Sequence, residues 1–192
     1  MDNRQLIMDC AKKLFYSKGY DAVGVQEIVS LAGITKPTLY YYFGSKLGLL
    51  RTIMETRFAE FRKYQNSILQ SDEDIRSLLY KTADYLCVFF DKDREFYILM
   101  MSLFYSAQDN EAYQVVKPYV TEFYETVVKA FDHCSDQLGN MNGRQRQFAI
   151  GFVGTLNHYL LMQREIDPAQ QENISREQIR SLVNQFMYGI FT

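Results

Sequence analysis

Residues 33–46 constrain the fold of this chain more strongly than any other stretch. The stretch begins with a glycine and then Thr35, a pattern typical of a helix end, a tight turn and the N-cap of a new helix. Pro37 falls in the first turn of that helix, where its missing N–H costs nothing. Leu39 and Phe43 are four residues apart and therefore share one face, which is the predicted core face.

Three consecutive tyrosines, Tyr40, Tyr41 and Tyr42, lie in the same short helix. At about 100° per residue they cannot all share the core face with Leu39. Tyr41 points away from Leu39, and Tyr40 and Tyr42 flank that outward face. We therefore expect tyrosine hydroxyls on the surface, although packing at a helix junction explains Tyr42 equally well.

A second short helix precedes the turn. Val25, Ile28, Val29 and Ala32 recur at helical spacing, and the pattern ends at Gly33. Two short helices joined by a tight glycine turn form the helix-turn-helix pattern, whose second helix enters the major groove of DNA. The local sequence therefore predicts a DNA-binding module.

Residues 4–50 resemble the N-terminal domain of the TetR family of bacterial transcriptional regulators. The resemblance rests on apolar, glycine and motif-helix positions spread over this stretch: Ala11, Phe15, Gly19, Tyr20, Ile28, Ala32, Gly33, Thr38, Leu39, Tyr40, Phe43, Ser45, Lys46, Leu49 and Leu50. It covers about a quarter of the chain, and the rest agrees in length and all-helical pattern. The family often opens its second helix with threonine or serine, where this chain has Val23 and Gly24, and favours an acidic residue where this chain has Leu47. A phosphate contact at the start of the second helix is therefore lost or left to the backbone N–H.

The predicted DNA-binding residues belong to the second motif helix and its two ends: Thr35, Lys36, Pro37, Thr38, Tyr40, Tyr41, Tyr42 and Lys46. The resemblance implies that Lys36, Pro37 and Tyr40 approach base edges. It also implies that Thr38, Tyr41, Tyr42 and Lys46 mainly hold phosphates, which are common partners of tyrosine hydroxyls and ammonium groups. The helix carries no arginine or asparagine for a bidentate base contact. We therefore expect thymine methyl contacts and DNA shape to contribute to specificity.

Charge is distributed unevenly along the chain. Residues 1–63 hold ten Lys/Arg and six Asp/Glu, a net charge of +4, whereas residues 64–192 hold eleven and seventeen, a net charge of −6. A basic head on an acidic body fits a DNA-binding module joined to a domain that avoids DNA, with chance variation as the alternative. The predicted organisation is a helix-turn-helix DNA-binding domain at 1–50 and an effector-binding and dimerisation domain at 51–192.

Hydrophobic periodicity predicts an all-α chain of about nine helices. Beyond the two motif helices, they are expected at about 4–18, 46–69, 72–90, 94–107, 111–138 and 144–166, with the last after a capping box at Ser175 and Gln178. Pro118 is expected to kink the seventh helix or to mark its true start.

Several kinds of site find no support in the sequence. The three cysteines are far apart, without disulfide or zinc spacing, and the two histidines are too few and too separated for a metal site. We see no catalytic constellation, and we expect no enzyme activity, no cofactor and no metal. The longest apolar run is about half of a membrane span, and no signal peptide opens the chain, so we expect a cytoplasmic protein without membrane contact.

Large side chains are abundant after the predicted DNA-binding domain, with ten Tyr and ten Phe from residue 64 onward. A plain aromatic core explains any one of these rings. The resemblance implies instead that a small hydrophobic or aromatic effector binds among the middle helices. The candidate ligand residues are mainly apolar and aromatic: Phe89, Met101, Phe104, Tyr105, Phe123, Phe152, Asn157 and His158. For His158, a satisfied core histidine is the alternative.

The last two helices have wide apolar faces, which predict a four-helix interface with a second copy. The candidate dimer residues lie on these two helices: Gly151, Thr155, Tyr159, Val183, Phe186 and Ile190. A homodimer suits a palindromic operator in double-stranded DNA. The sequence thus predicts a ligand-responsive regulator, foremost a repressor that its effector releases. An activator, a corepressor-dependent repressor and a binding protein that no longer binds DNA remain alternatives.

Overall fold

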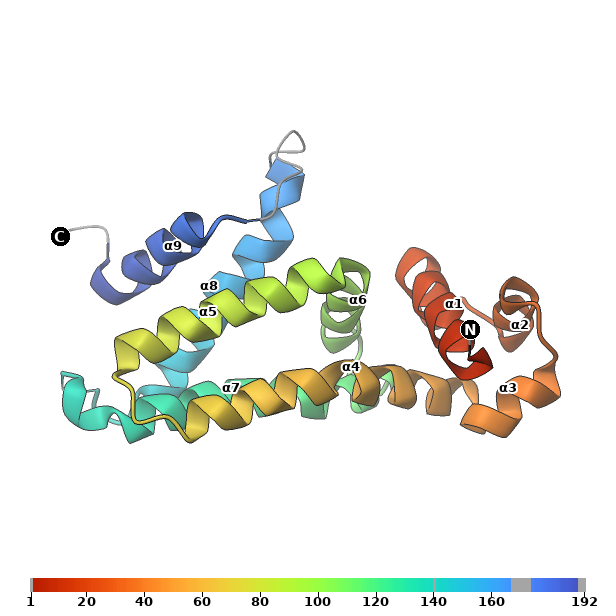
Figure 1. Cartoon of the computed structure of the whole chain (residues 1–192), viewed down its shortest axis with the longest axis horizontal. Helices are drawn as coiled ribbons and strands as arrows, with labels where there is room; N and C mark the ends of the chain where they lie inside the picture. The colour runs from red at the N-terminus through yellow and green to blue at the C-terminus, as the bar shows by residue number, and fades with distance from the viewer. Residues whose placement is uncertain (1, 140, 167–173, 190–192) are drawn as a thin grey trace. The chain divides into compact units, whose positions relative to one another are not determined.

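The structure is a computed structural model that describes residues 2–139, 141–166 and 174–189. These residues form α-helices and one short 3-10 helix, and none of them forms a strand. In chain order (Figure 1), the elements are α1 (Asn3–Lys18), α2 (Val25–Ala32), α3 (Lys36–Phe43), α4 (Lys46–Leu69), α5 (Ile75–Lys92), α6 (Arg94–Phe104), α7 (Glu111–His133), η1 (Ser135–Gln137), α8 (Gln145–Ile166) and α9 (Arg176–Tyr188). The all-α prediction is confirmed.

The helix boundaries differ from the sequence prediction at α5, which spans Ile75–Lys92 and not 72–90, and at the ends of α6 and α7. Helix α7 ends at His133, and the separate 3-10 turn that follows occupies residues predicted to continue it. Helix α6 ends at Phe104, three residues before the predicted boundary, because Tyr105 already leaves the helix as its C-cap. Pro118 lies inside α7 and does not mark its start. The capping box of α9 is confirmed, since the side chains of Ser175 and Gln178 each accept from the other's backbone N–H.

Internal contacts divide the chain into two compact units. Unit 1 comprises residues 1–61 and 93–120, and unit 2 comprises residues 62–92 and 121–192. The division predicted at residue 50 falls inside α4 and stays a prediction about function. Helices α4 and α7 each contain a boundary between the two units.

The core of unit 1 is built where α1 packs against α2 and α6. Its fully buried side chains include Ile7 and Phe15 of α1, Ile28 of α2 and Leu39 of α3. The aromatic ring of Tyr20, in the turn after α1, is also buried and lies 5.1 Å from the ring of Phe15, centroid to centroid. The three short N-terminal helices are thereby fixed around one apolar centre.

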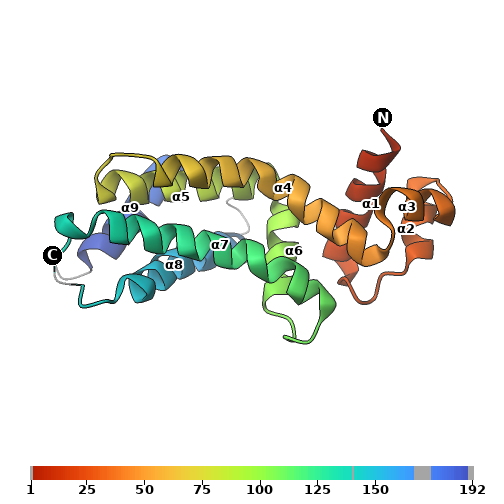
Figure 2. The same cartoon turned by 90° about the horizontal axis from the view of Figure 1, so that it is seen from below.

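The core of unit 2 forms where α5 packs against α8 and α9 (Figure 2). Leu78, Leu86 and Phe90 of α5 are buried, as are Phe152 and Leu156 of α8. Polar side chains are buried among them: Gln65, Thr82, Thr126 and Asn157. Helix α9 contributes Ile179 and Val183, at the spacing of one helix face.

Candidate DNA-binding helix and ligand cavity

The turn between α2 and α3 sets the direction of the exposed helix. Helix α2 ends at Gly33, which adopts the left-handed conformation with φ 66°, a region that favours glycine. Thr35 then caps α3, because its side-chain oxygen accepts a hydrogen bond from the backbone N–H of Thr38 at 3.4 Å. At the other end of the motif, Gly24 is the N-cap of α2 and makes no side-chain cap hydrogen bond.

Helix α3 has one buried face and one exposed face. Leu39 and Phe43 are buried, as predicted. Tyr41 is 84% exposed, Tyr40 46% and Tyr42 37%, so all three tyrosines belong to the exposed side of the helix. The rings of Tyr41 and Tyr42 meet edge to face, with centroids 5.3 Å apart. Of the remaining predicted DNA-binding residues in or beside α3, Thr35, Lys36 and Pro37 are exposed and Thr38 is half-buried.

The ammonium of Lys46, at the start of α4, has an internal role that the sequence reasoning did not find. It donates hydrogen bonds to the carbonyl oxygens of Tyr20 and Val23, each at 3.1 Å, and lies 4.1 Å from the centroid of the Tyr20 ring. Lys46 therefore clamps the turn that leads from α1 into α2. Two of the three ammonium hydrogens are engaged in this way, which leaves one for a phosphate. Its contact with DNA stays a prediction.

The junction of α3 and α4 is unusually close. Ser45 caps α4 by accepting a hydrogen bond from the backbone N–H of Gly48 at 2.9 Å. A Cβ atom added to Gly48 would stand 2.0 Å from the carbonyl oxygen of Phe43. The position therefore requires glycine, and the tight junction fixes the exposed face of α3 relative to α4.

Polar contacts tie the N-terminal helices to α6 and α7 within unit 1. The ammonium of Lys12 lies 2.7 Å from a carboxylate oxygen of Asp93, the N-cap of α6. The hydroxyl of Tyr20 donates a hydrogen bond to the carboxylate of Glu111 at 2.7 Å. Burial, and to a smaller extent this hydrogen bond, raises the pKa of the Tyr20 phenol. The amide nitrogen of Asn110 donates to Asp21 at 2.7 Å. These partners are 81 to 91 residues apart, so local sequence patterns carry no signal for them.

The predicted ligand residues are divided between the two units. Met101, Phe104 and Tyr105 belong to unit 1, whereas Phe89, Phe123, Phe152, Asn157 and His158 belong to unit 2. Met101, Phe123, Phe152 and Asn157 are buried, Phe89 and Phe104 are half-buried, and Tyr105 and His158 are exposed. The alternative that His158 is a core histidine is therefore wrong. A ligand role for these eight residues stays a prediction.

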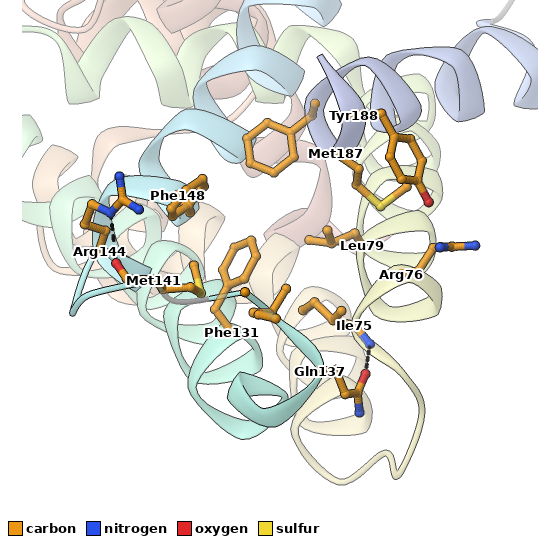
Figure 3. A pocket seen from close by; sticks show the side chains of 13 residues that line it. Ile75, Arg76, Leu79, Phe131, Gln137, Met141, Arg144, Phe148, Met187 and Tyr188 are labelled. Atoms are coloured by element: carbon orange, nitrogen blue, oxygen red, sulfur yellow. Dashed lines mark hydrogen bonds between the residues drawn. The ribbon is translucent and has the colours of Figure 1, made fainter. Parts of the chain in front are cut away.

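A cavity of about 540 Å³ lies elsewhere in unit 2, and none of those eight residues lines it (Figure 3). Its walls come from α5, the end of α7, the 3-10 turn and the segment that follows it, α8 and α9. The lining is mainly apolar: Ile75, Arg76, Leu79, Phe131, Gln137, Leu138, Gly139, Met141, Arg144, Phe148, Phe186, Met187 and Tyr188. Periodicity missed this cavity because its walls come from ends of helices that are distant in sequence.

The predicted dimer residues have mixed environments. Gly151 and Thr155 are exposed on one face of α8, and Tyr159 is half-buried on the same helix. Val183 is fully buried within its own chain, which corrects the prediction that it faces a partner, because its spacing also fits the core stripe of α9. Phe186 is half-buried, and Ile190 lies outside the described residues.

Across 2–139, 141–166 and 174–189, no group of three or more His, Cys, Asp or Glu side chains is placed to hold a metal ion. In the same part of the chain, none of the helices has the length and hydropathy that a membrane span requires.

The tight turn, the capped α3 and its exposed hydroxyl face define a helix-turn-helix protein of the transcription-regulator class. The family description "Bacterial regulatory proteins, tetR family" matches residues 7–53, which cover α2 and α3 and most of α1. This N-terminal segment therefore carries the regulatory-protein domain of the TetR family, as the sequence resemblance indicated.

Relatives and solved structures agree with this placement. The chain is 29% identical over 152 residues to the transcriptional activator FasR of Mycolicibacterium smegmatis, a match that covers 79% of this chain and 68% of FasR. In the next two curated relatives, both named as repressors from Escherichia coli, the match covers only 39% and 24% of the relative.

Two solved structures share the fold over nearly the whole chain. The regulator FadR from Bacillus subtilis, in complex with stearoyl-CoA, has a TM-score of 0.78 at 16% identity and covers 97% of this chain and 98% of its own. AibR, in complex with isovaleryl coenzyme A and operator DNA, has a TM-score of 0.71 at 20% identity. The match covers 96% of this chain and 97% of the AibR chain.

Proposed function

We propose that this protein is a dimeric, ligand-responsive regulator that binds a palindromic operator and acts as a repressor until a small hydrophobic or aromatic effector releases it. The observation that carries the proposal is the exposed face of α3. Its three tyrosines and Lys36 extend outward, while Leu39 anchors the opposite side in the core. Hydroxyls and an ammonium on one outward helix face suit the phosphates and base edges of a major groove.

The proposed DNA contacts are those predicted from the sequence. Lys36, Pro37 and Tyr40 approach bases, and Thr38, Tyr41 and Tyr42 hold phosphates, with Thr35 at the start of the helix. Lys46 acts mainly by positioning the α1–α2 turn, and its remaining N–H is available to a phosphate. A single short helix reads few base pairs, so two copies on half-sites about 34 Å apart supply the required affinity.

Dimerisation is proposed to use the exposed face of α8. Gly151 and Thr155 lie on this face, with Ile150 beside them 54% exposed. Small side chains allow two helices to approach closely, and the adjacent apolar surface gives the contact a hydrophobic component. Two-fold symmetry of this interface matches the symmetry of a palindrome.

An effector with an acyl chain is supported by the relatives. FadR and AibR were each solved with an acyl thioester of coenzyme A. In the proposed mechanism, the effector binds one arrangement of the helices more tightly and shifts the population toward it. Helix α4, which contains residues of both units, transmits the change toward the α3 helices of the dimer.

The proposal includes no enzyme activity and no cofactor, in line with the regulators that the chain resembles. It places the protein in the cytoplasm, where bacterial operators lie. Activation is the second candidate function, because FasR is named as an activator. A binding protein that no longer contacts DNA is the third, and the exposed tyrosines of α3 argue against it.

Selection of bound sequences from a random DNA pool tests the proposal. We expect enrichment of a palindrome with half-sites about one helical turn apart. A reporter placed behind that palindrome then separates repression from activation. Absence of any enriched sequence contradicts the proposal and favours the binding protein without DNA contact.

A further inference from the structure

The charged residues that line the cavity of unit 2 are all basic, which indicates the charge of a matching ligand. Among its lining residues, the charged side chains are Arg76 of α5 and Arg144, which immediately precedes α8, and none is acidic. The volume of about 540 Å³ lies within the range of small-molecule sites, roughly 300–1,000 Å³. An apolar space with basic groups at its edge suits a molecule that is apolar along most of its length and anionic at one end.

Both arginines rest against aromatic rings of the lining. The guanidinium carbon of Arg76 lies 5.6 Å from the ring centroid of Tyr188, and that of Arg144 lies 5.5 Å from the ring centroid of Phe148. Figure 3 shows the two arginines on opposite sides of the cavity. A guanidinium stacked on a ring keeps N–H groups at its edge, which can pair with a carboxylate or phosphate without leaving the ring.

The apolar walls are suited to a chain or ring system. Ile75 and Leu79 of α5 are buried, and Phe131 of α7 is buried opposite them. Figure 3 shows the side chains of Leu79 and Phe131 on facing sides of this space, and Met187 beside Tyr188 above them. Filling this space removes apolar ligand surface from water at roughly 25 cal/mol per Å².

We propose that this cavity binds an amphipathic anion, with its apolar part between α5, α7 and α9 and its carboxylate or phosphate at Arg76 or Arg144. This inference rests on the proposed function insofar as the bound anion serves as the effector. The site differs from the eight middle-helix residues that the sequence analysis named. The site accommodates either a free fatty acid or a larger molecule that carries both an acyl chain and a phosphate. In both cases the apolar chain fills the cavity and the anionic group pairs with an arginine.

Phe186 connects the cavity to the proposed dimer helix. Its ring lines the cavity and lies 5.1 Å from the ring of Phe152 on α8, centroid to centroid. A Cβ atom added to Gly151 would be 3.7 Å from the same ring, so Phe186 is already in contact range of the exposed face of α8. A ligand that displaces Phe186 therefore alters the packing of α8 against α9.

Calorimetric titration of the full chain, without DNA, tests the site. The probes are dodecanoate, the uncharged 1-dodecanol and dodecanoyl-CoA. We expect dodecanoate to bind at least about tenfold more tightly than 1-dodecanol, because a charge-assisted pair with arginine is lost in the alcohol. Tighter binding of dodecanoyl-CoA than of dodecanoate identifies a phosphate-bearing effector, and the reverse order identifies a free acid.

Variants locate the binding. The double variant Arg76→Ala with Arg144→Ala should reduce the affinity for dodecanoate at least about tenfold and leave the affinity for 1-dodecanol unchanged. Arg146→Ala is the matched control, because Arg146 lies near Arg144 in sequence but pairs with Glu125 at 2.7 Å and does not line the cavity. Met187→Trp narrows the cavity and should weaken the binding of both dodecanoate and 1-dodecanol. Thermal unfolding of each variant establishes that it is folded.

Three results overturn the inference: no binding of any probe by the folded protein, dodecanoate affinity unchanged in the double variant, or affinity unchanged in Met187→Trp. These outcomes are separate from a failure of the proposed function. An enriched palindrome without probe binding overturns the cavity site alone. Probe binding at the cavity without any enriched DNA sequence overturns the regulator and leaves the site standing.

Discussion

The exposed face of α3 and the cavity of unit 2 are two recognition surfaces built in opposite ways. The α3 face is convex and comes from one eight-residue helix, whose side chains extend into solvent while Leu39 and Phe43 hold it from below. The cavity is concave and comes from helix ends far apart in sequence. A convex helix face tolerates changes in its outward residues, whereas a concave site depends on every element that forms its wall.

The first prediction compares a leucine beneath each surface. Leu39→Ala should lower the free energy of unfolding by about 2–5 kcal/mol, because Leu39 is completely buried in a packed core. Leu79→Ala should cost less, since Leu79 already borders the cavity and loses fewer contacts. Urea unfolding measures both. Equal losses would show that the cavity wall is packed as tightly as the core beneath α3.

The second prediction concerns the junction that holds α3. Gly48→Ala should destabilise the protein by about 1–3 kcal/mol, because the new Cβ would meet the carbonyl oxygen of Phe43 at 2.0 Å. Gly154→Ala is the control, since a Cβ there meets nothing within 4 Å and alanine favours the helix. Thermal unfolding distinguishes the two. An unchanged melting temperature in Gly48→Ala would show that the junction is loose.

The third prediction compares the roles of two lysines in the N-terminal helices, Lys46 and Lys36. Lys46→Ala should lower stability by about 1–2 kcal/mol, because it removes hydrogen bonds to two backbone carbonyls, and it should weaken binding to all DNA sequences. Lys36→Ala should leave stability unchanged, because Lys36 is exposed, and should weaken DNA binding alone. Urea unfolding and fluorescence anisotropy measure the two properties. Identical stabilities of the two variants would remove the internal role of Lys46.

The fourth prediction tests the outward face itself. Tyr41→Ala should leave the free energy of unfolding within about 0.5 kcal/mol, because the side chain is 84% exposed, and should weaken operator binding about tenfold. Tyr16→Ala is the control, since Tyr16 is 41% exposed on α1 outside the motif. If both variants bind the operator equally well, the α3 face is not the DNA surface.

Local sequence rules describe the N-terminal helices α2 and α3 well. The glycine end of α2, the Thr35 cap, and the alternation of Leu39 and Phe43 with outward tyrosines all follow from residues within a few positions of one another. Short-range backbone and hydrogen-bonding preferences determine such features, so a single sequence contains the necessary information.

The same rules fail for contacts between distant segments. The clamp by Lys46 and the pair of Tyr20 with Glu111 join residues 26 and 91 positions apart, respectively. The ligand prediction chose aromatic residues of the middle helices, but which rings border an open space depends on how helix ends meet. An apolar position on α9 fits an inner or an outer face equally well, so the sequence pattern alone does not reveal that Val183 is buried in its own chain.

The most direct test of the central claim is to measure binding of the purified protein to the selected operator and to a scrambled duplex over a range of salt concentrations. We expect the operator to bind at least about a thousandfold more tightly than the scrambled duplex, and the logarithm of both affinities to fall linearly with the logarithm of the salt concentration. Equal affinity for the two duplexes, or no salt-dependent binding to either, would contradict the assignment of α3 as a sequence-reading helix.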